Sequence, residues 1–523
     1  MFTFLCQSNR LSGAFDGTGD SSKSIAYQSP VFEITNPRNH TWDDDEGLLN
    51  FGADSSDADF WRIRDACEGV LILGAVGSGK TSGSGSAIAK AFLTAGFGGL
   101  VLTAKPDEAR RWLRLCEQTG RMGDCVHVKP GSGHGLNILQ YEAERPGDRV
   151  SITDDLIGLL GCIIGVMSRS KQKSERDDFW SNAKRGLLKN LLEVFLLAGE
   201  PITIHGLVRF VNSAPTSPDC PWRTIPLFGG MMARAEKKSR DGSRGDKDDY
   251  ADALEYWTKS FPREPDVTRG GYVAAFTAMA NYLTGRGVGE ILCGETNLTP
   301  EAILSGKIVI LDFPIKESQE EGNMVQATWK LLFQQAVERR ADKGLNSARP
   351  AFLWEDEGHE FFSQQDVRFQ PTARDCRIPH VIISQNIQNF LHLGHSEHAV
   401  EAVFSAMNTY IFHTNADLYT NRWASEHIGE EKRLTLTTDG LIRPRRSKDF
   451  SFSSRRPEEV ENVGGMQIFE EKKQSVRPED FSKLKRGGDG TCEAVILWLS
   501  HRFAINQNRN FSRRIFEQEK RTT

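Results

Sequence analysis

The pattern of apolar and polar residues predicts strands and helices in alternation. Residues 70–73 form an uninterrupted apolar run, residues 84–94 have helical composition, and residues 99–102 are apolar again. Such alternation predicts a parallel sheet with helices packed on its faces. A helix is also expected at residues 324–343. Further strands are predicted at residues 307–311, 351–354, 381–384, 409–413 and 494–498.

The pattern becomes helical between residues 154 and 212. Apolar side chains recur at three- and four-residue spacing from Phe179 to Phe195, as in an amphipathic helix. The longest apolar run, Leu156 to Met167, is far shorter than the roughly 20 residues of a membrane span. It therefore predicts a buried helix, and we expect no membrane span in this chain.

Composition narrows the class of protein. The chain has 523 residues, 38% of them apolar, which is enough for two or three globular domains. A net charge of -5 argues against a surface coated in basic residues but allows a basic inner channel. Nine cysteines without a Cys-x-x-Cys pair, and an N-terminus unlike a signal peptide, predict a cytoplasmic location. Recruitment to the inner face of the cell membrane is left open.

A glycine-rich motif follows the first predicted strand. Residues 74–81 read Gly-Ala-Val-Gly-Ser-Gly-Lys-Thr, which fits Gly-x4-Gly-Lys-Thr between a strand and a helix. In such a loop, backbone N–H groups point at phosphate oxygens. Lys80 would bridge the outer phosphates of ATP, and Thr81 would bind Mg²⁺. The predicted nucleotide-binding residues are Gly74, Gly77, Ser78, Gly79, Lys80 and Thr81.

A phosphate-loop ATPase also needs a carboxylate for Mg²⁺ and a second one to activate water. Two predicted strands end in acids: one in Asp312 alone, the other in Glu355-Asp356-Glu357. Only the second offers a metal ligand, Asp356, beside a general base, Glu357, so we interpret Asp312 as structural. Gln385, after the strand at residues 381–384, is expected to reach the γ-phosphate or its attacking water.

These motifs, in this order, resemble the coupling ATPases of conjugation and type IV secretion systems (TraG/TrwB type), within the wider translocase group of FtsK and HerA. The resemblance covers residues 65–515, with Asp356-Glu357 as Walker B acids and Gln385 as sensor. Residues 178–180 resemble the opening of the family's all-α domain. In two respects the chain departs from the family. Thr103-Ala104-Lys105 replaces an Asp-Pro-Lys signature, and the family's N-terminal membrane helices are not expected in this chain.

The resemblance implies an α/β fold: a RecA-like P-loop NTPase sheet with helices on both faces, interrupted by an all-α insertion domain. It implies ATP and Mg²⁺ as cofactors and a homohexamer in which Arg374 reaches the γ-phosphate of a neighbouring subunit. Arg377 is the rival arginine, and pairing with Asp375 or solvent is the structural alternative for both.

The expected function is that of an ATP-driven DNA translocase, which moves DNA, with or without a bound relaxase, through a hexameric ring. Its grip on DNA would be independent of sequence and would weaken with salt. Two alternatives stay open. One is a nucleotide-regulated platform that recruits protein substrates to a type IV secretion channel. The other is a DNA-packaging or defence ATPase of the same superfamily.

The expected organisation has four segments: a leader at residues 1–60, the first part of the nucleotide-binding domain at 61–150, the all-α domain at 151–290 and the second part at 291–523. A strand is expected at residues 30–34. The charged run at residues 237–246 predicts a solvated loop. His392, His395 and His398 are interpreted as a surface loop or helix start rather than a metal site. Core positions are expected for Trp61, Trp112, Trp329 and Trp354.

Overall fold

The computed structural model describes residues 41–52, 59–145, 149–168, 176–317, 319–341, 348–438, 466–506 and 508–519. The strand expected at residues 30–34 lies outside these residues.

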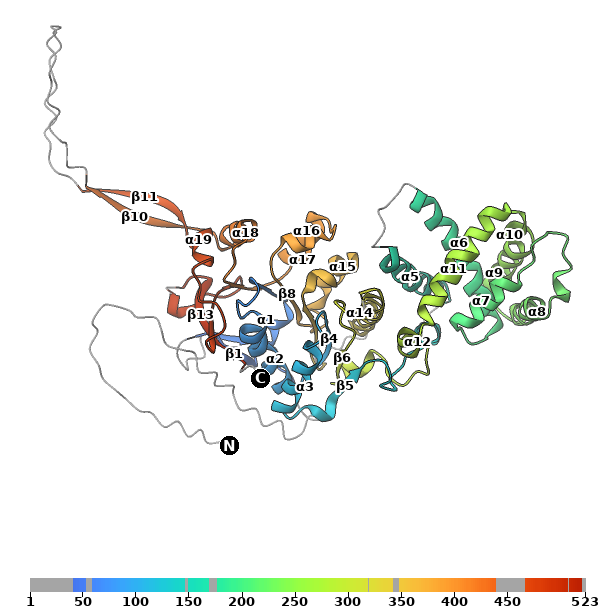
Figure 1. The fold of residues 1–523 in the computed structure, drawn as a ribbon, viewed down its shortest axis with the longest axis horizontal. Helices are drawn as coiled ribbons and strands as arrows, with labels where there is room; N and C mark the ends of the chain where they lie inside the picture. Colours follow the sequence, from blue (N-terminus) through green and yellow to red (C-terminus); the bar gives the residue numbers. More distant parts are fainter. Residues whose placement is uncertain are drawn as a thin grey trace, which may run out of the picture.

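The largest element of the fold is a nine-stranded sheet with the order β13-β12-β9-β3-β8-β7-β4-β6-β5 (Figure 1). The seven strands from β9 to β5 in this order pair in parallel, and β12 and β13 are antiparallel to their neighbours. The strands are β3 (Val70–Leu73), β4 (Gly98–Leu102), β5 (Cys125–Val128), β6 (Ile308–Leu311), β7 (Ala351–Asp356), β8 (His380–Ser384), β9 (Thr409–His413), β12 (Thr491–Trp498) and β13 (Phe511–Glu517). The parallel sheet predicted from the sequence is confirmed.

Helices cover both faces of this sheet, which explains why its central strands are apolar throughout. Successive side chains of β3 point to opposite faces: Val70 and Ile72 pack with α2, and Leu71 and Leu73 pack with α16 to α18. On the first face lie α1 (Ile63–Cys67), α2 (Ser86–Thr94) and α3 (Glu108–Gln118). On the other lie α14 (Gln319–Ala341), α15 (Gln364–Ala373), α16 (Gln388–His392), α17 (Glu397–Ser405), α18 (Leu418–Ile428) and α19 (Pro478–Phe481).

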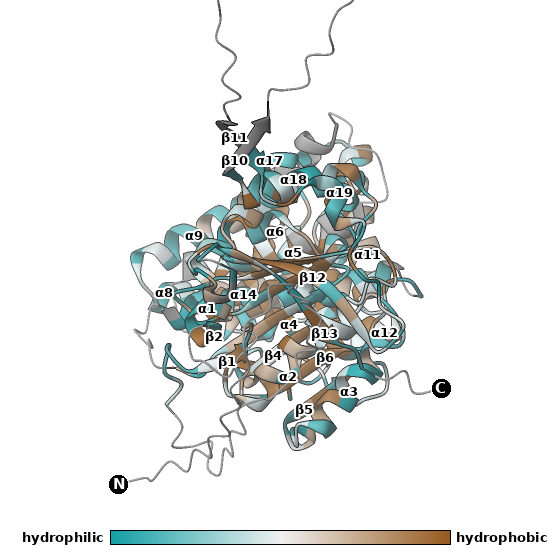
Figure 2. Ribbon diagram, turned by 90° about the vertical axis from the view of Figure 1, so that its left-hand side faces the viewer, coloured by the Kyte–Doolittle hydropathy of each residue, from teal (hydrophilic) through white to brown (hydrophobic). Residues whose placement is uncertain are grey.

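Aromatic rings fill the first face. The ring of Phe352 on β7 stacks on Phe92 of α2 and on Trp112 of α3. The four tryptophans expected in the core are all buried: Trp61, Trp112, Trp329 and Trp354. Figure 2 shows apolar colours along the strands inside the fold and hydrophilic colours on its surface.

A run of helices interrupts the sheet between β5 and β6 and lies to one side of it (Figure 1). It comprises α4 (Ile138–Ala143), α5 (Arg149–Ser168), α6 (Arg176–Ala198), α7 (Ile204–Ser213), α8 (Pro226–Asp241), α9 (Arg244–Glu255), α10 (Phe261–Arg263), α11 (Asp266–Leu283), α12 (Arg286–Leu292) and α13 (Glu301–Leu304). The all-α insertion is confirmed, and a helix covers residues 156–167 as expected, with Leu156, Leu159, Leu160 and Ile163 buried.

The charged run at residues 237–246 is not a loop, so that prediction is wrong. Helix α8 continues to Asp241, and α9 begins after only two residues. The side chain of Ser243 accepts a hydrogen bond from the backbone N–H of Asp246, and the Asp246 carboxylate accepts one from the N–H of Ser243. This capping box stabilises the start of α9 within a sequence whose composition is typical of a loop.

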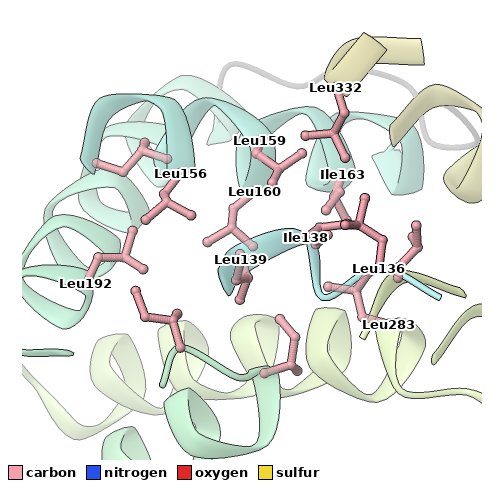
Figure 3. Close-up of a cluster of buried hydrophobic side chains, with 14 of the residues drawn as sticks. Leu136, Ile138, Leu139, Leu156, Leu159, Leu160, Ile163, Leu192, Leu283 and Leu332 are labelled. Atoms are coloured by element: carbon pink, nitrogen blue, oxygen red, sulfur yellow. The ribbon is translucent and has the colours of Figure 1, made fainter. Parts of the chain in front are cut away.

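The inserted helices attach to the sheet domain through α14. Figure 3 shows Leu332 of α14 in one apolar cluster with Leu159 and Ile163 of α5 and with Leu283 of α11. Apolar packing of this kind is close to crystalline in density, so it transmits displacement instead of absorbing it. A movement of α5 or α11 therefore reaches α14.

Two antiparallel ribbons complete the described fold. Strands β1 (Gly47–Asn50) and β2 (Phe60–Arg62) pair beside α2, where Trp42 donates a hydrogen bond of 2.8 Å from Nε1 to the carbonyl of Ala95. Strands β10 (Glu430–Thr438) and β11 (Met466–Gln474) project from the body of the molecule (Figure 1). Among helices in the described part of the chain, none is both long and apolar enough to cross a bilayer.

Replacing Leu332 with Ala should lower the free energy of unfolding by about 2–5 kcal/mol, because it leaves a cavity where α14 meets the inserted helices. Chemical denaturation measures the change. The matched control is Leu393→Ala, since Leu393 is 48% exposed and its loss should change stability by less than about 0.5 kcal/mol. Equal losses in the two variants would contradict the packing described for Leu332.

Candidate nucleotide-binding site

The glycine-rich motif forms a loop at the carboxyl end of β3. The N–H of Gly74 donates to the carbonyl of Ser384 at 3.2 Å, and the N–H of Ala75 donates to that of Thr414 at 2.9 Å, so the loop starts between β8 and β9. Gly77 and Gly79 have φ angles of 73° and 92°, in the left-handed region that favours glycine. The loop thus has the curled backbone that phosphate binding requires.

Lys80 and Thr81 follow the loop and point to the end of β7. The chain passes through one π-helical turn (Thr81–Gly85) before α2 begins. Thr81 Oγ1 donates a hydrogen bond of 2.8 Å to Asp356 Oδ2. Lys80 is only 7% exposed. Burial lowers its pKa, although the carboxylates of Asp356 and Glu357 act in the opposite direction.

The order of the strands brings the other predicted residues to the same place. Strand β8 lies between β3 and β7, so Gln385 after β8 stands between the loop and the acids of β7. Gln385 Nε2 lies 3.5 Å from Glu357 Oε2. Glu357 itself has left-handed backbone angles (φ 57°, ψ 47°), which are rare for a residue with a side chain and cluster at functional sites.

The electrostatic surroundings keep Glu357 ionised. Burial acts to raise its pKa, but the ion pair with Lys105 and the charge of Lys80 outweigh burial and lower it. His359 Nδ1 lies 3.8 Å from the second carboxylate oxygen of Glu357 and 3.0 Å from Ser384 Oγ. Glu357 is therefore a buried carboxylate, held by its neighbours in the protonation state of a general base.

The chemistry of these donors fits a magnesium nucleotide. Thr81 Oγ1 and Asp356 Oδ2 lie 2.8 Å apart and are oxygen atoms of the kind that Mg²⁺ prefers as ligands. The loop supplies backbone N–H groups and Lys80 supplies a positive charge, so both kinds of phosphate partner are present. All six predicted loop residues, Asp356, Glu357 and Gln385 thus lie at one edge of the sheet, although β3 and β7 are far apart in sequence.

Lys105 is a site residue that the sequence analysis did not assign. It follows β4, the strand beside β7, and its Nζ forms an ion pair with Glu357 Oε1. The backbone N–H groups of Ala104 and Lys105 donate to Glu108 Oε2 at 2.7 and 3.1 Å. Burial and the charge of Asp356 raise the pKa of Glu108 to about 8. The one signal in the sequence was that Lys105 stands where the resemblance places the lysine of the Asp-Pro-Lys signature.

Residues near the end of the chain hold the phosphate loop and the turn after it by hydrogen bonds; we call these contacts the brace. The N–H of Gly487 donates to the carbonyl of Gly77 at 3.1 Å, and Gln518 Nε2 donates to Ser82 Oγ at 2.7 Å. Arg111 Nη2 donates to the carbonyl of Thr81 at 2.6 Å and Nε donates to Glu519 Oε2 at 2.9 Å. Sequence reasoning missed this brace, because no local motif marks contacts between segments so distant in the chain.

Asp312 lies elsewhere. Its Oδ2 is 2.8 Å from His127 Nε2, at the ends of β6 and β5. Strand β6 is separated from β7 by β4, so Asp312 is not beside Thr81. Among the described residues no group of three or more His, Cys, Asp or Glu could hold a metal ion, and this includes the segment with His392, His395 and His398.

The two candidate arginines lie near the opposite edge of the sheet, before β8 begins. Arg377 is buried; its Nη2 donates to the carbonyl of Trp42 at 2.6 Å and pairs with Asp44 at 2.9 Å. Arg374 has a 66% exposed side chain and pairs with Glu68, just before β3, at 3.0 Å. The structure therefore brings neither arginine to the phosphate loop of its own chain, and only Arg374 is open to a neighbour.

The fold is similar to that of solved conjugative coupling proteins. The unbound form of TrwBdeltaN70 has a TM-score of 0.56 and 12% identity, over 90% of this chain and 90% of that chain. TrwB with the GTP analogue GDPNP has a TM-score of 0.52 and 12% identity, over 89% and 90% of the two chains. TrwB with the ATP analogue ADPNP has a TM-score of 0.52 and 13% sequence identity, over 88% of each chain. Neither a protein-family model nor a curated protein matches the chain in sequence.

At 12–13% sequence identity, the structural similarity establishes the fold alone. The chain has the RecA-like P-loop fold of TrwB, with a mostly parallel nine-stranded sheet and an inserted helical segment. The fold class predicted from the sequence is confirmed, and the resemblance to the coupling proteins is confirmed at the level of the fold.

Replacing Asp356 with Asn should weaken Mg²⁺-dependent binding of a nucleotide by about tenfold or more, because one anionic oxygen next to Thr81 is lost. Titration of a fluorescent ATP analogue with Mg²⁺ and with a chelator measures the loss, which should vanish with the chelator. Asp312→Asn is the matched control at another strand end and should leave both affinities unchanged. If Asp312→Asn weakened Mg²⁺-dependent binding and Asp356→Asn did not, the metal would be assigned to Asp312.

Proposed function

We propose that the chain is an ATP-driven DNA translocase of the conjugative coupling-protein type. The observation that carries the proposal is the hydrogen bond of 2.8 Å between Thr81 and Asp356, which are 275 residues apart in the chain. It joins the phosphate loop to the acidic end of β7. The similarity in fold to TrwB, a plasmid coupling protein solved with ATP and GTP analogues, supports the coupling-protein type and the nucleotide.

Each residue has a defined role in the proposed hydrolysis. The loop N–H groups and Lys80 bind the phosphates, and Thr81 with Asp356 would hold Mg²⁺, which supplies charge neutralisation when bound. Water attacks the γ-phosphorus, and the bond to the β-phosphate oxygen breaks with its electron pair leaving on ADP. Glu357 accepts the proton of the water, and Gln385, 3.5 Å from Glu357, orients that water.

The position of Arg374 indicates an oligomer. A positive charge that stabilises the γ-phosphate must lie within a few ångströms of it, and Arg374 lies at the far edge from its own loop. Together with Glu68 it lines two surface cavities of about 350 and 490 Å³. We infer a homohexameric ring in which Arg374 of each subunit completes the site of the next, through a head-to-tail interface that closes by rotation.

The response of ATP hydrolysis to DNA or to a protein partner distinguishes the alternative functions. A DNA translocase, with or without a relaxase attached, should hydrolyse ATP faster on DNA, because the grip on DNA belongs to the catalytic cycle. A platform that recruits protein substrates to a secretion channel should respond to its protein partner instead. A packaging or defence ATPase of the same superfamily should also respond to DNA and would be distinguished by the partners that it binds.

Hydrolysis of ATP by the full chain should rise when DNA is added, and Glu357→Gln should lower kcat by about 10²–10⁴ while ATP stays bound, because the proton acceptor is lost. A coupled assay of ADP release gives the rate, and filter retention of labelled ATP gives the bound fraction. Unchanged turnover in Glu357→Gln would refute the assignment of the base. A rate that ignores DNA of either form would refute the translocase.

Arg374→Ala should lower kcat by about 10³ with little change in ATP affinity, because Arg374 acts on the transition state of the neighbouring site. Arg368→Ala, at an exposed arginine on α15, the helix that ends just before Arg374, is the control and should retain the wild-type rate.

Mixing Arg374→Ala protein with Lys80→Ala protein provides a further test. Composite sites between the two would pair an intact Lys80 with an intact Arg374, so activity should partly return. If mixing restores nothing and Arg374→Ala alone keeps the wild-type rate, Arg374 does not act between subunits.

A further inference from the structure

Lys105 engages the general base of the proposed reaction directly. Its Nζ forms an ion pair with Glu357 Oε1, and Glu108 Oε1 lies 3.8 Å from the same nitrogen. Lys105 is one-third exposed, whereas the side chain of Glu357 is almost fully buried. The lysine therefore covers the carboxylate on one side while part of its own side chain stays in contact with solvent.

Both oxygens of Glu357 have donors in this arrangement. Oε1 pairs with Lys105, while Oε2 lies 3.5 Å from Gln385 Nε2 and 3.8 Å from His359 Nδ1. A carboxylate oxygen that is bound to an ammonium group is a weaker proton acceptor, because proton transfer must first displace a favourable charge pair. Glu357 is thus in place as the base, but its Oε1 is already paired with Lys105.

The position of Lys105 depends on helix α14. The N–H of Thr103 donates to Gln326 Oε1 at 2.6 Å, and Gln326 Nε2 donates back to the carbonyl of Thr103 at 2.9 Å. Gln326 also holds the carbonyl of Phe313, after β6, at 2.8 Å. The loop that carries Lys105 is therefore fastened to α14 through a fully buried amide.

The same helix also fastens the strand of Glu357. Lys330, one turn after Gln326, is buried and pairs with Glu355 of β7 at 2.6 Å and with Asp366 of α15 at 2.7 Å. Residues four apart lie on one face of a helix, so a single face of α14 sets the relative position of the Lys105 loop and of β7. Leu332 joins that helix to the inserted helices (Figure 3).

The geometry points to Lys105 as a latch: a positioning residue that holds Glu357 inactive until DNA binding shifts α14 and moves the Lys105 loop relative to β7, which separates the pair. This inference rests on the proposed ATP hydrolysis and adds its regulation. Once Lys105 has left, Glu357 Oε1 accepts the proton of the attacking water, the new bond forms between water oxygen and γ-phosphorus, and ADP leaves with the electron pair of the broken bond.

Steady-state ATP hydrolysis by the full chain, with and without DNA, tests the latch. Lys105→Met should raise the rate without DNA by roughly three- to tenfold, because the base is freed, and should bring the ratio of stimulated to basal rate close to one. Lys105→Arg keeps the ion pair and should retain a low basal rate and the stimulation. Lys129→Met, an exposed lysine after β5, is the matched control and should behave as wild type. Lys105→Gln replaces Lys105→Met if the latter misfolds.

The outcomes separate the latch from the function on which it rests. A rise in the basal rate that Lys105→Arg does not share supports the latch. An unchanged or lower basal rate in both Lys105→Met and Lys105→Gln, in a chain that hydrolyses ATP and loses activity in Glu357→Gln, overturns the latch alone. A wild-type chain that does not hydrolyse ATP under any of these conditions overturns the proposed function, and the latch with it.

Discussion

The constraint on which the structure depends is the parallel alignment of β3, β8 and β7. Parallel strands end at one edge of a sheet, and the short loops at that edge bring together residues that are distant in sequence. Here the alignment brings Thr81 within 2.8 Å of Asp356 and places Gln385 3.5 Å from Glu357. A shift of register by one residue in β7 would turn these acids to the other face. The apolar packing on both faces therefore protects the geometry of the site.

Buried polar groups link this site to the rest of the molecule. Burial acts to lower the pKa of Lys330, but the carboxylates of Asp366 and Glu355 outweigh it and raise that pKa, so the lysine stays charged within the fold. Breaking such a pair is costly, because it leaves an uncompensated charge in the interior. Helix α14 is therefore a rigid connector between the inserted helices and the nucleotide edge, and the device proposed for Lys105 uses this rigidity.

Much of the fold could be predicted from the sequence, since strands buried on both faces appear as continuous apolar runs. Strand β13 was missed because Arg513 and Arg514 interrupt its apolar pattern. The phosphate loop and the acids of β7 stand out as local motifs, whereas the brace by Gln518 and Glu519 depends on tertiary contacts alone. Lys105 could not be assigned because its contact requires β4 to lie beside β7. The choice between Arg374 and Arg377 likewise depends on burial, which no motif encodes.

An experimental structure of the full chain with a non-hydrolysable ATP analogue and Mg²⁺ would show whether the phosphate loop and the acids of β7 share one bound nucleotide. We expect a Mg²⁺ ion at about 2.1 Å from Thr81 Oγ1, on the side of Asp356, with Lys80 against the outer phosphates and Glu357 facing the γ-phosphate. A nucleotide bound elsewhere, or a Mg²⁺ ion on the far side of the sheet from Asp356, would contradict this expectation.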